Sequence, residues 1–350
     1  MFEDLLRSWD GEFVASRFDA ASDAWMFIGV HSTTLGPGFG GTRMKSYPTV
    51  EDGLRDVLRL SAAMSAKNAL ASLPFGGGKA VLAVPKLPEG SERLDLLRRY
   101  ADLVDSLGGS YVTACDMNTT ERDMDVVGER SSFVMGRSLA AGGSGSSGPD
   151  TAVGVYHGIR ASLAHVFGSH DPAGLSVAVQ GCGAVGSHLV KLLAEAGAKL
   201  VVSDVDAART RSLADRFGAR VVPPGDEFDS ECDLFSPCAT GGVLSAETIP
   251  RLRCRIVAGA ANNQLATPED GRLLAEAGIL YAPDYIVNAG GVMHLAGVER
   301  LGWSRAELDE RLAGIGRTLA EVFSIADGDG LTPAEAADRL ALARIAAGRA

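Results

Sequence analysis

The sequence predicts an α/β fold in two domains, and three observations support this prediction. The chain has 350 residues, a length typical of about two domains that each bury a core. Segments with strand-like and helix-like patterns follow one another along it. A stretch rich in glycine and serine, AGGSGSSGPD at 141–150, interrupts these patterns and is the best candidate for a boundary. We therefore expect one domain over residues 1–140 and a second that begins at 141.

The composition excludes several classes of protein. Hydrophobic residues make up 46% of the chain and charged residues 22%, as in ordinary soluble globular proteins. The net charge of -11 argues against a nucleic-acid-binding protein, which would carry a basic surface. The N-terminus, MFEDLLRSWDGEF, is unlike a signal peptide, and no apolar run reaches the length of a membrane span. We therefore expect a cytoplasmic protein with no membrane partner.

The cysteines and histidines form no pattern typical of a metal site or a disulfide framework. The five cysteines are odd in number, widely scattered and without a CxxC motif. The six histidines are dispersed as well and include no HExxH motif. The sequence therefore predicts neither a metal site nor a disulfide framework.

The first domain should begin with two strands and a glycine-rich segment. Residues 11–33 read as two strands joined by the turn DAASD. The next segment, LGPGFGGTR at 35–43, has four glycines, so its exposed backbone amides could wrap a small anion, although a plain loop is the alternative. Thr49 then has the position of an N-cap, and the helix that follows presents one apolar face and leads to Lys67.

Two lysines flank three consecutive glycines in the segment MSAKNALASLPFGGGKAVL at 64–82. Lys67 should lie at a helix end and Lys79 at the start of an apolar strand, with a Pro-Phe-Gly-Gly-Gly turn between them. Glycines here let a ligand or another strand approach the backbone closely. Burial and a second ammonium nearby both lower the pKa of a lysine, which suits it to proton transfer. The alternative is a pair of surface lysines beside a turn.

A carboxylate follows the next predicted strand. A helix over about 91–107 precedes the strand Tyr111–Ala114, and Asp116 lies just past the strand end. Such strand ends are where α/β folds place chemistry, so Asp116 is a candidate general acid or base. It could equally cap the next helix, as Thr119, Thr120 and Asp123 could.

The second domain carries a dinucleotide-binding fingerprint. After a helix over 151–167, a buried strand runs directly into Gly181-x-Gly183-x-x-Gly186, which opens another helix. A second strand ends at Asp204, 18 residues after Gly186. In a Rossmann fold, such glycines permit the tight turn and close approach to a pyrophosphate, and such an acid accepts hydrogen bonds from the adenosine ribose. Since a carboxylate would repel a 2′-phosphate, Asp204 favours NAD over NADP.

The remaining strands and helices complete this pattern. Strand-like pieces at 232–238, 254–261 and 279–288 end in CAT, ANNQ and NAGG, so small and amide side chains gather at their carboxyl ends. Asn262 and Asn263 could also be simple turn residues. Residues 304–350 read as two amphipathic helices, the second capped by Thr332 ahead of Pro333 and Glu335.

The ordered set of motifs resembles the glutamate/leucine/phenylalanine/valine dehydrogenase family from about Trp9 to Ile345. The motifs are LGPGFGGTR, MSAKNALASLPFGGGKAVL, VTACDMNTT, QGCGAVG, GAANNQLA and APDYIVNAGG. The resemblance implies an N-terminal α/β catalytic domain, a Rossmann NAD-binding domain over 141–324 and an active-site cleft between them. It also implies that C-terminal helices over about 325–350 complete the first domain, and that the protein is a homo-oligomer.

The resemblance assigns roles to individual residues. Lys79 would activate a water molecule and Asp116 would exchange protons with it, in the NAD-dependent, reversible deamination of an L-amino acid to a 2-oxo acid and ammonia. Lys67 would hold the substrate carboxylate with the backbone of Gly40 and Gly41. The other implied substrate-binding residues are Phe39, Ala114, Asn263, Val292 and Leu295. The implied cofactor-binding residues are Thr151, Gly181, Cys182, Gly183, Ala184, Val185, Gly186, Asp204, Cys238, Ala239, Ala260, Asn262 and Asn288.

An apolar amino acid is the expected substrate. The glutamate enzymes of the family have a lysine where Phe39 stands and a serine where Leu295 stands. A charged substrate side chain buried against these apolar residues would cost several kcal/mol. Asn118 and the segment VNAGGVMHLAGVERLGW most resemble phenylalanine-specific members, so phenylalanine is the first expectation and leucine or valine the alternative. Phe39 could shrink the pocket, or stack on an aromatic substrate.

Two other functions remain open from the sequence. An NAD-binding regulatory protein that lost its chemistry would lack a lysine or the aspartate, whereas Lys67, Lys79 and Asp116 are all present. A purely structural oligomer would leave the glycine fingerprint unexplained. Cys115 and Cys238 lie near the expected cleft, but buried cysteines are usually inert, so we expect no thiol chemistry from them.

Overall fold

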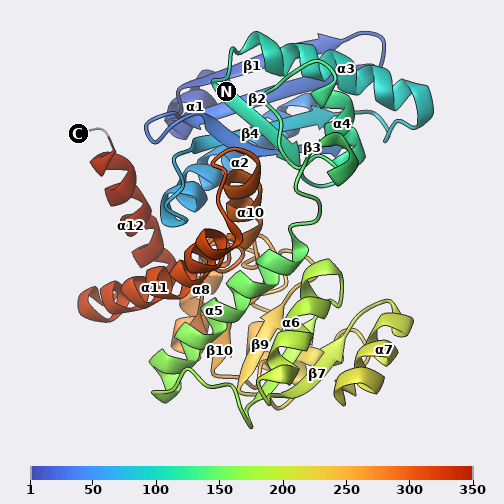
Figure 1. The fold of residues 1–350 in the computed structure, drawn as a ribbon. Helices are drawn as coiled ribbons and strands as arrows, with labels where there is room; N and C mark the ends of the chain where they lie inside the picture. Colours follow the sequence, from blue (N-terminus) through green and yellow to red (C-terminus); the bar gives the residue numbers. More distant parts are fainter. Residues whose placement is uncertain (1, 349–350) are drawn as a thin grey trace. The chain divides into compact units, whose positions relative to one another are not determined.

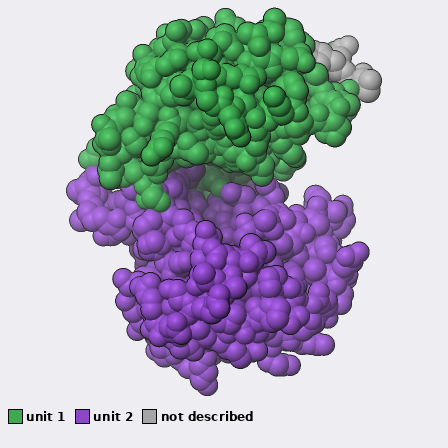
Figure 2. Space-filling model, turned by 90° about the vertical axis from the view of Figure 1, so that its right-hand side faces the viewer, with its two compact units in different colours: residues 1–146, 295–302, 341–350 green, residues 147–294, 303–340 purple. Residues whose placement is uncertain are grey.

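The structure is a computed structural model, which describes residues 2–348. The chain forms two compact units, coloured separately in Figure 2. The first comprises residues 1–146, 295–302 and 341–350, and the second comprises residues 147–294 and 303–340. The predicted α/β fold class with two domains is confirmed. The first unit extends to Ser146, within the stretch that the sequence marks as a boundary, and the functional division at 140/141 stays a prediction.

The first unit is built on a five-stranded sheet with the order β1-β2-β4-β3-β5 (Figure 1). β2 pairs antiparallel with β1 and β4, whereas β3 runs parallel to both β4 and β5. The strands are β1 (Phe13–Asp19), β2 (Ala24–Ser32), β3 (Gly38–Lys45), β4 (Gly76–Ala83) and β5 (Tyr111–Cys115), and the helices are α1 (Phe2–Trp9), α2 (Val50–Leu70), α3 (Gly90–Ser106) and α4 (Glu121–Gly128).

Side chains that alternate along the strands fill two cores, one on each face of this sheet. Phe27 and Val81 pack with Val57 of α2 on one face. Met26 and Ile28 point to the other face, where Leu96 and Tyr100 of α3 and Met124 of α4 cover the sheet. Capping boxes fix the starts of two of these helices, with Thr49 as the N-cap of α2 and Thr120 as that of α4.

Two glycine-rich segments that the sequence assigns to a loop and a turn are strands. Gly38–Lys45 forms β3, and Gly76–Gly78 lie inside β4, so both local predictions were wrong. The glycines serve close packing instead of chain reversal. A side chain at Gly76 would lie 1.8 Å from the carbonyl oxygen of Ser32, and one at Gly77 would lie 2.0 Å from Ser65 Oγ of α2. The chain reverses earlier, over 71–74.

The second unit is built on a six-stranded parallel sheet with the order β11-β10-β9-β6-β7-β8 (Figure 1). The strands are β6 (Ser176–Gln180), β7 (Lys199–Ser203), β8 (Arg220–Val221), β9 (Leu234–Pro237), β10 (Ile256–Val257) and β11 (Leu280–Tyr281). The helices are α5 (Gly148–Phe167), α6 (Ala184–Glu195), α7 (Ala207–Phe217), α8 (Asp270–Glu276), α9 (Asp284–Val287) and α11 (Arg305–Asp329). α10 (Gly290–Glu299) and α12 (Pro333–Ala347) each begin in this unit and end in the first.

The strand predicted over 279–288 is shorter than expected. β11 spans Leu280–Tyr281, and Pro283 precedes the short helix α9. The hydroxyl of Tyr281 donates a hydrogen bond to Asp284 Oδ1 at 2.8 Å, which holds the turn between strand and helix. The predicted cap of the last helix is confirmed, because Thr332 and Glu335 exchange hydrogen bonds in a capping box. Within residues 2–348, no helix is long and apolar enough to cross a membrane.

The crowding around Gly77 predicts a large stability difference between two Gly→Ala substitutions. Gly77→Ala should lower the free energy of unfolding by roughly 2–3 kcal/mol, since the new methyl group meets Ser65 on its backbone as well as its side chain. Gly328→Ala is the matched control in α11, where nothing lies within 4 Å of the new methyl group. It should raise stability by about 0.5–1 kcal/mol. Equal urea midpoints for both variants would contradict the close packing of β4 on α2.

Candidate active site

Lys79 and Asp116 meet across β3, an interior strand of the sheet of the first unit. Lys79 lies in β4 and Asp116 directly follows β5, with β3 between these two strands. Thr42 of β3 pairs with Ala80 on one side and Cys115 on the other, so Gly41 lies in the row between Lys79 and Ala114. A side chain at Gly41 would come within 2.9 Å of Asp116 Cβ. Because that side chain is absent, Lys79 Nζ reaches Asp116 Oδ1 at 3.2 Å.

Arg43 is a third charged member of this cluster, and the sequence analysis missed it. Its Nε donates to Asp116 Oδ2 at 3.0 Å, and its Nη1 donates to Asp56 Oδ2 at 3.0 Å. Tyr47 also donates to Asp56 Oδ2, at 2.7 Å. The signal was present in the motif LGPGFGGTR, where Arg43 stands two residues after Gly41 and therefore on the same face of β3.

The environment shifts the pKa values of both partners. Burial lowers the pKa of the Lys79 ammonium, Asp116 opposes this shift, and the charge of Arg43 adds to it. Burial raises the pKa of Asp116, but the charges of Lys79 and Arg43 outweigh it and lower the pKa to about 2. Asp116 is therefore an ionised carboxylate near neutral pH. Lys79 is an ammonium that releases its proton more readily than an ordinary lysine.

The predicted substrate residues of the first unit gather on the same face of the sheet. Lys67 lies in the last turn of α2, where the buried Asn68 donates to the carbonyl oxygens of Phe39 at 3.3 Å and Gly76 at 2.7 Å. These bonds fix the end of the lysine-bearing helix to β3 and β4. Tyr111 donates to the carbonyl oxygen of Gly40 at 2.6 Å.

The apolar candidates of this unit are almost fully buried. The exposed fraction of Phe39 is 1%, and its ring packs on Phe75 with centroids 5.4 Å apart. Ala114 is 2% exposed. Leu295 and the thiol of Cys115 both lie beside the Gly136 backbone, which brings Leu295 close to the end of β5. Burial raises the pKa of the Cys115 thiol and keeps it protonated.

Glu299 holds the segment around Gly136 in place. It accepts hydrogen bonds from the amides of Gly136 and Ser144 and from the Ser144 hydroxyl. Sequence reasoning gave no role to Glu299, because its partners lie more than 150 residues away along the chain and no local pattern links them.

The predicted nucleotide fingerprint lies at the carboxyl end of β6. Gly181 has a φ of +91°, and a side chain there would lie 2.7 Å from Ala239. A side chain at Gly186 would lie 1.9 Å from the Gly181 carbonyl oxygen, whereas nothing lies within 4 Å of the corresponding position at Gly183. The loop is therefore tightly packed on its inner side and open at Gly183, as a pyrophosphate would require. Cys182, Ala184 and Val185 complete this turn into α6.

Asp204 is tied to this loop. Its Oδ2 accepts a hydrogen bond from the Cys182 amide at 2.6 Å, and its Oδ1 accepts one from the Asp206 amide at 2.7 Å. A carboxylate can accept about four hydrogen bonds, so capacity for a ribose hydroxyl is left. Cys238 lies at the same edge of the sheet, just after β9, and its amide donates a hydrogen bond to the Gln180 carbonyl oxygen at 2.7 Å. Burial raises the pKa of the Cys238 thiol.

The asparagines gather at the carboxyl ends of β10 and β11. Asn288 Nδ2 donates to the Ala260 carbonyl oxygen at 3.1 Å and to Asn262 Oδ1 at 2.8 Å. Asn263 has a φ of +52°, a turn conformation, and its amide donates to Asp284 Oδ2 at 2.7 Å. Thr151, in the first turn of α5, lies against the backbone of Gly291, one residue before Val292. All the predicted cofactor residues thus lie in the second unit, together with Asn263 and Val292.

A polar cluster around the buried Asp150, next to Thr151, was also missed by the sequence analysis. Asp150 Oδ2 lies 2.6 Å from His294 Nδ1, and Asp150 Oδ1 lies 2.7 Å from Arg305 Nη1. The pKa of Asp150 is lowered because hydrogen bonds from His294 and Arg305 outweigh the effect of burial. This cluster joins the starts of α5 and α11 to α10, and no sequence motif connects these three segments.

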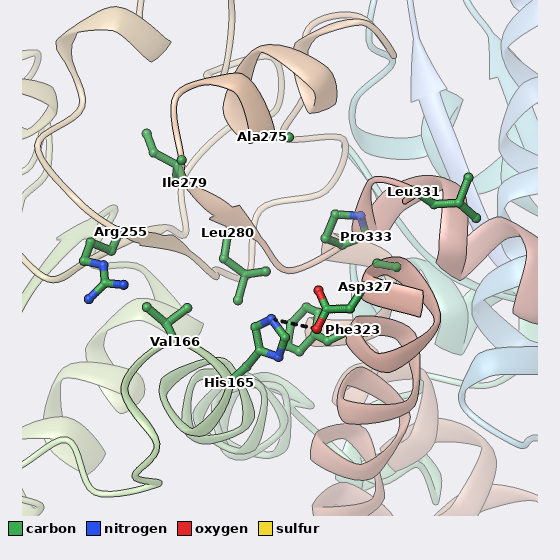
Figure 3. Close-up of a pocket in the computed structure, with 12 residues that line it drawn as sticks. His165, Val166, Arg255, Ala275, Ile279, Leu280, Phe323, Asp327, Leu331 and Pro333 are labelled. Atoms are coloured by element: carbon green, nitrogen blue, oxygen red, sulfur yellow. Dashed lines mark ion pairs between the residues drawn. The ribbon is translucent and has the colours of Figure 1, made fainter. Parts of the chain in front are cut away.

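A pocket of about 360 Å³ lies at the opposite edge of the six-stranded sheet (Figure 3). Arg255 and Leu280, at the starts of β10 and β11, line it together with Phe323 of α11. Figure 3 shows His165 paired with Asp327, at a distance of 3.8 Å. No predicted site residue lines this pocket. In the described part of the chain, no three His, Cys, Asp or Glu side chains gather as ligands of a metal ion would.

The lowered pKa of Asp116 predicts a specific acid sensitivity. The pKa of Asp116 is about 2 in the folded chain and 3.8 ordinarily. At pH values between these two, the folded chain therefore binds fewer protons at Asp116 than the unfolded chain does. Asp116 therefore stabilises the fold above about pH 4, and roughly 2 kcal/mol of this is lost as the pH falls to about 2. In urea unfolding across this range, Asp116→Asn should show a shallower loss of stability than the parent chain. Asp215→Asn, at an exposed position of α7, is the control and should lose as much stability across this pH range as the parent chain does.

Comparison with known proteins gives the family. Residues 22–132 match "Glu/Leu/Phe/Val dehydrogenase, dimerisation domain", and residues 207–349 match "Glutamate/Leucine/Phenylalanine/Valine dehydrogenase". Leucine dehydrogenase of Geobacillus stearothermophilus is 41% identical over 97% of this chain and 92% of its own. Valine dehydrogenase of Streptomyces albus is 44% identical over 95% of this chain and 91% of its own. The crystal structure of L-tryptophan dehydrogenase from Nostoc punctiforme matches with a TM-score of 0.87 and 38% identity, over 100% of this chain and 99% of that chain. The chain therefore belongs to the Glu/Leu/Phe/Val dehydrogenase family, as its ordered motifs predict.

Proposed function

We propose that this protein catalyses the NAD-dependent oxidative deamination of an apolar, branched-chain L-amino acid to its 2-oxo acid and ammonia, reversibly. The observation that carries the proposal is the buried contact of Lys79 with Asp116, supported on its other side by Arg43. A lysine with a lowered pKa next to a fixed carboxylate is equipped to move protons near neutral pH. The sequence relationship to leucine and valine dehydrogenases supports the same reaction.

Lys79 is the group to which we assign water activation. When bound, the coenzyme would supply the hydride acceptor for oxidation of the substrate Cα to an imino acid. In its neutral amine form, Lys79 Nζ orients a water molecule and takes up its proton as the water attacks the imino carbon. Since burial lowers the pKa of this amine, it alternates between its two protonation states at a small energetic cost.

Asp116 is the partner to which we assign proton exchange with Lys79. Its Oδ1 faces Lys79, while Arg43 Nε holds its Oδ2. Because the charge of Arg43 keeps the carboxylate ionised, Asp116 accepts hydrogen bonds throughout most of the cycle. Arg43 is a positioning residue in this scheme, because it acts through the aspartate.

Lys67 is the proposed partner of the substrate carboxylate, with Gly40 and Gly41. Its place at the end of α2 is fixed by the neighbouring Asn68, which is hydrogen bonded to both β3 and β4. A lysine ammonium together with side-chain-free backbone would suit a small carboxylate that must come close to the sheet.

The apolar residues Phe39, Ala114, Val292 and Leu295 are the proposed side-chain pocket. None carries a group that could pair with a substrate carboxylate, so glutamate is disfavoured. The leucine and valine dehydrogenases are 41% and 44% identical to this chain and the L-tryptophan dehydrogenase is 38% identical, which favours branched-chain substrates over the phenylalanine that the sequence pattern placed first. The packing of the Phe39 ring on Phe75 agrees with a residue that limits pocket size instead of stacking on an aromatic substrate.

NAD is the proposed coenzyme. The open position at Gly183 and the close packing of Gly181 and Gly186 fit a pyrophosphate at the start of α6. Asp204 is held by two backbone amides at the position from which it would accept ribose hydroxyls and repel a 2′-phosphate. A homo-oligomer, in line with the dimerisation domain named in the family description, is part of the proposal. The cytoplasmic location stays a prediction from the sequence.

Coenzyme reduction across a panel of L-amino acids tests the proposed reaction. With NAD, we expect kcat/KM to be highest for leucine, valine or isoleucine, lower for phenylalanine, and lower by a factor of at least about 100 for glutamate. Replacing NAD by NADP should reduce kcat/KM strongly. Reduction that is strongest with glutamate would contradict the pocket, and no reduction with any amino acid despite NAD binding would favour the inactive regulatory protein.

Two lysine substitutions separate chemistry from substrate binding. Lys79→Ala should lower kcat by roughly a thousandfold and leave the Kd for NAD unchanged, since the coenzyme residues are distant in the chain and belong to the other unit. Lys67→Ala should raise KM for the amino acid roughly 10- to 100-fold, because a charge-assisted hydrogen bond is lost. Lys86→Ala, on an exposed loop after β4, is the control and should match the parent enzyme. A Lys79→Ala enzyme with near-normal kcat would refute the assigned role.

A further inference from the structure

Two of the five thiols lie opposite each other where β9 and β10 begin. Leu234 of β9 pairs with Ile256 of β10, and the preceding bridge joins Glu231 to Arg253. Both pairs have the same offset (256 − 234 = 22 and 253 − 231 = 22), so Cys232 stands in register with Cys254. The Cys232 amide donates to the Arg253 carbonyl oxygen at 3.4 Å, which continues the ladder through this position.

This register meets the geometric requirement of a disulfide. Neighbouring strands lie about 4.8 Å apart, and the side chains of an in-register parallel pair point to the same face. A disulfide needs Cα atoms roughly 4.4–6.8 Å apart, with Cβ atoms on the same side. Both cysteines also pack against one apolar cluster, which includes Phe235 and Val257. The strand register therefore places the two cysteines within the Cα separation that a disulfide requires.

The two thiols differ in exposure and reactivity. Cys232 is half-buried, whereas Cys254 is buried with 9% of its surface exposed. The hydrogen bond between the thiols lowers the pKa of Cys232 and raises that of Cys254. The more accessible sulfur is thus also the better thiolate, and the buried one lies next to it as a resolving thiol.

We propose that Cys232 and Cys254 are an oxidisable pair that forms a reversible disulfide between β9 and β10. With hydrogen peroxide as the oxidant, the Cys232 thiolate attacks the O–O bond, giving a sulfenic acid and hydroxide. The Cys254 sulfur then displaces hydroxide from the sulfenic acid, its proton completes a water molecule, and the S–S bond forms. In sum, two thiols and one peroxide give one disulfide and two waters. A dithiol reductant reverses the bond by thiol–disulfide exchange.

The disulfide would crosslink the starts of β9 and β10, at the end of the sheet opposite to the proposed coenzyme site. Cys232 precedes β9, and Cys238, which packs near Gly186, follows its other end. The crosslink closes a loop from 232 to 254 that includes all of β9 and its following segment. It restricts the unfolded chain, so it stabilises the second unit and leaves the glycine loop unchanged. This inference is independent of the proposed function, because it concerns thiols at the amino edge.

Oxidation of the full-length protein with hydrogen peroxide, followed by removal of the peroxide, tests the proposal. Titratable thiols in denaturant should fall from the five of the reduced chain to three, and a dithiol should restore all five. The oxidised protein should unfold about 5 °C higher than the reduced one, with the KM for NAD unchanged within about twofold. Non-reducing digestion that also cuts after Phe235 separates Cys232 from Cys238 and should yield the Cys232 peptide joined to that of Cys254.

Cys232→Ser and Cys254→Ser provide the matched variants. Cys232→Ser should keep its four remaining thiols on brief oxidation. Cys254→Ser should lose at most the Cys232 thiol, as a sulfenic acid that a dithiol restores, and neither variant should show the rise in unfolding temperature. The proposal is overturned if the parent protein keeps five thiols, if the two lost thiols map to other cysteines, or if Cys232 accumulates sulfinic acid without a bond to Cys254. The peptide map of the parent protein decides the question even if one variant fails to fold.

Discussion

The first unit depends on a buried ion pair that can form only because a side chain is missing. Lys79 and Asp116 belong to strands that are not neighbours, and β3 separates them. Gly41 leaves the row between them empty, so the charges meet directly at 3.2 Å. Burying two charges is costly unless they are paired and hydrogen bonded, and Arg43 supplies the second bond to the aspartate. The proposed catalytic geometry therefore rests on this glycine.

The opposite face of β3 is held by hydroxyl groups. Thr42 Oγ1 lies 2.5 Å from the Tyr100 hydroxyl and 2.6 Å from Thr113 Oγ1, all of them buried. Such a satisfied network is rigid, because each group would lose a hydrogen bond if it moved. Successive residues of β3 thus serve two purposes: Gly41 and Arg43 face the charged cluster, while Thr42 anchors the strand to α3. This arrangement explains how a glycine-rich segment can form a well-ordered interior strand.

The two edges of the six-stranded sheet have different chemistry. The carboxyl edge carries glycines, asparagines and Asp204, groups that can hold a nucleotide through backbone and amide contacts. The amino edge carries the thiol pair and the pocket of Figure 3, which is lined by Arg255, the residue directly after Cys254. The thiol pair and the groups suited to a nucleotide therefore lie at opposite ends of the same short strands.

The sequence by itself determined the family, the α/β class, the order of most strands and helices, and the candidate residues Lys67, Lys79, Asp116 and Asp204. The family follows from the resemblance of the ordered motifs. The rest follows from local patterns, since caps, periodicity and glycine spacing act within a few residues. Sequence reasoning failed where glycines served packing, because the neighbours of Gly41 and Gly77 come from other strands and helices. Only the tertiary structure decided the partners of Arg43, Glu299 and Asp150, and only it brought Cys232 opposite Cys254. Those contacts join segments far apart in the chain, and strand register, which no local pattern specifies, sets them.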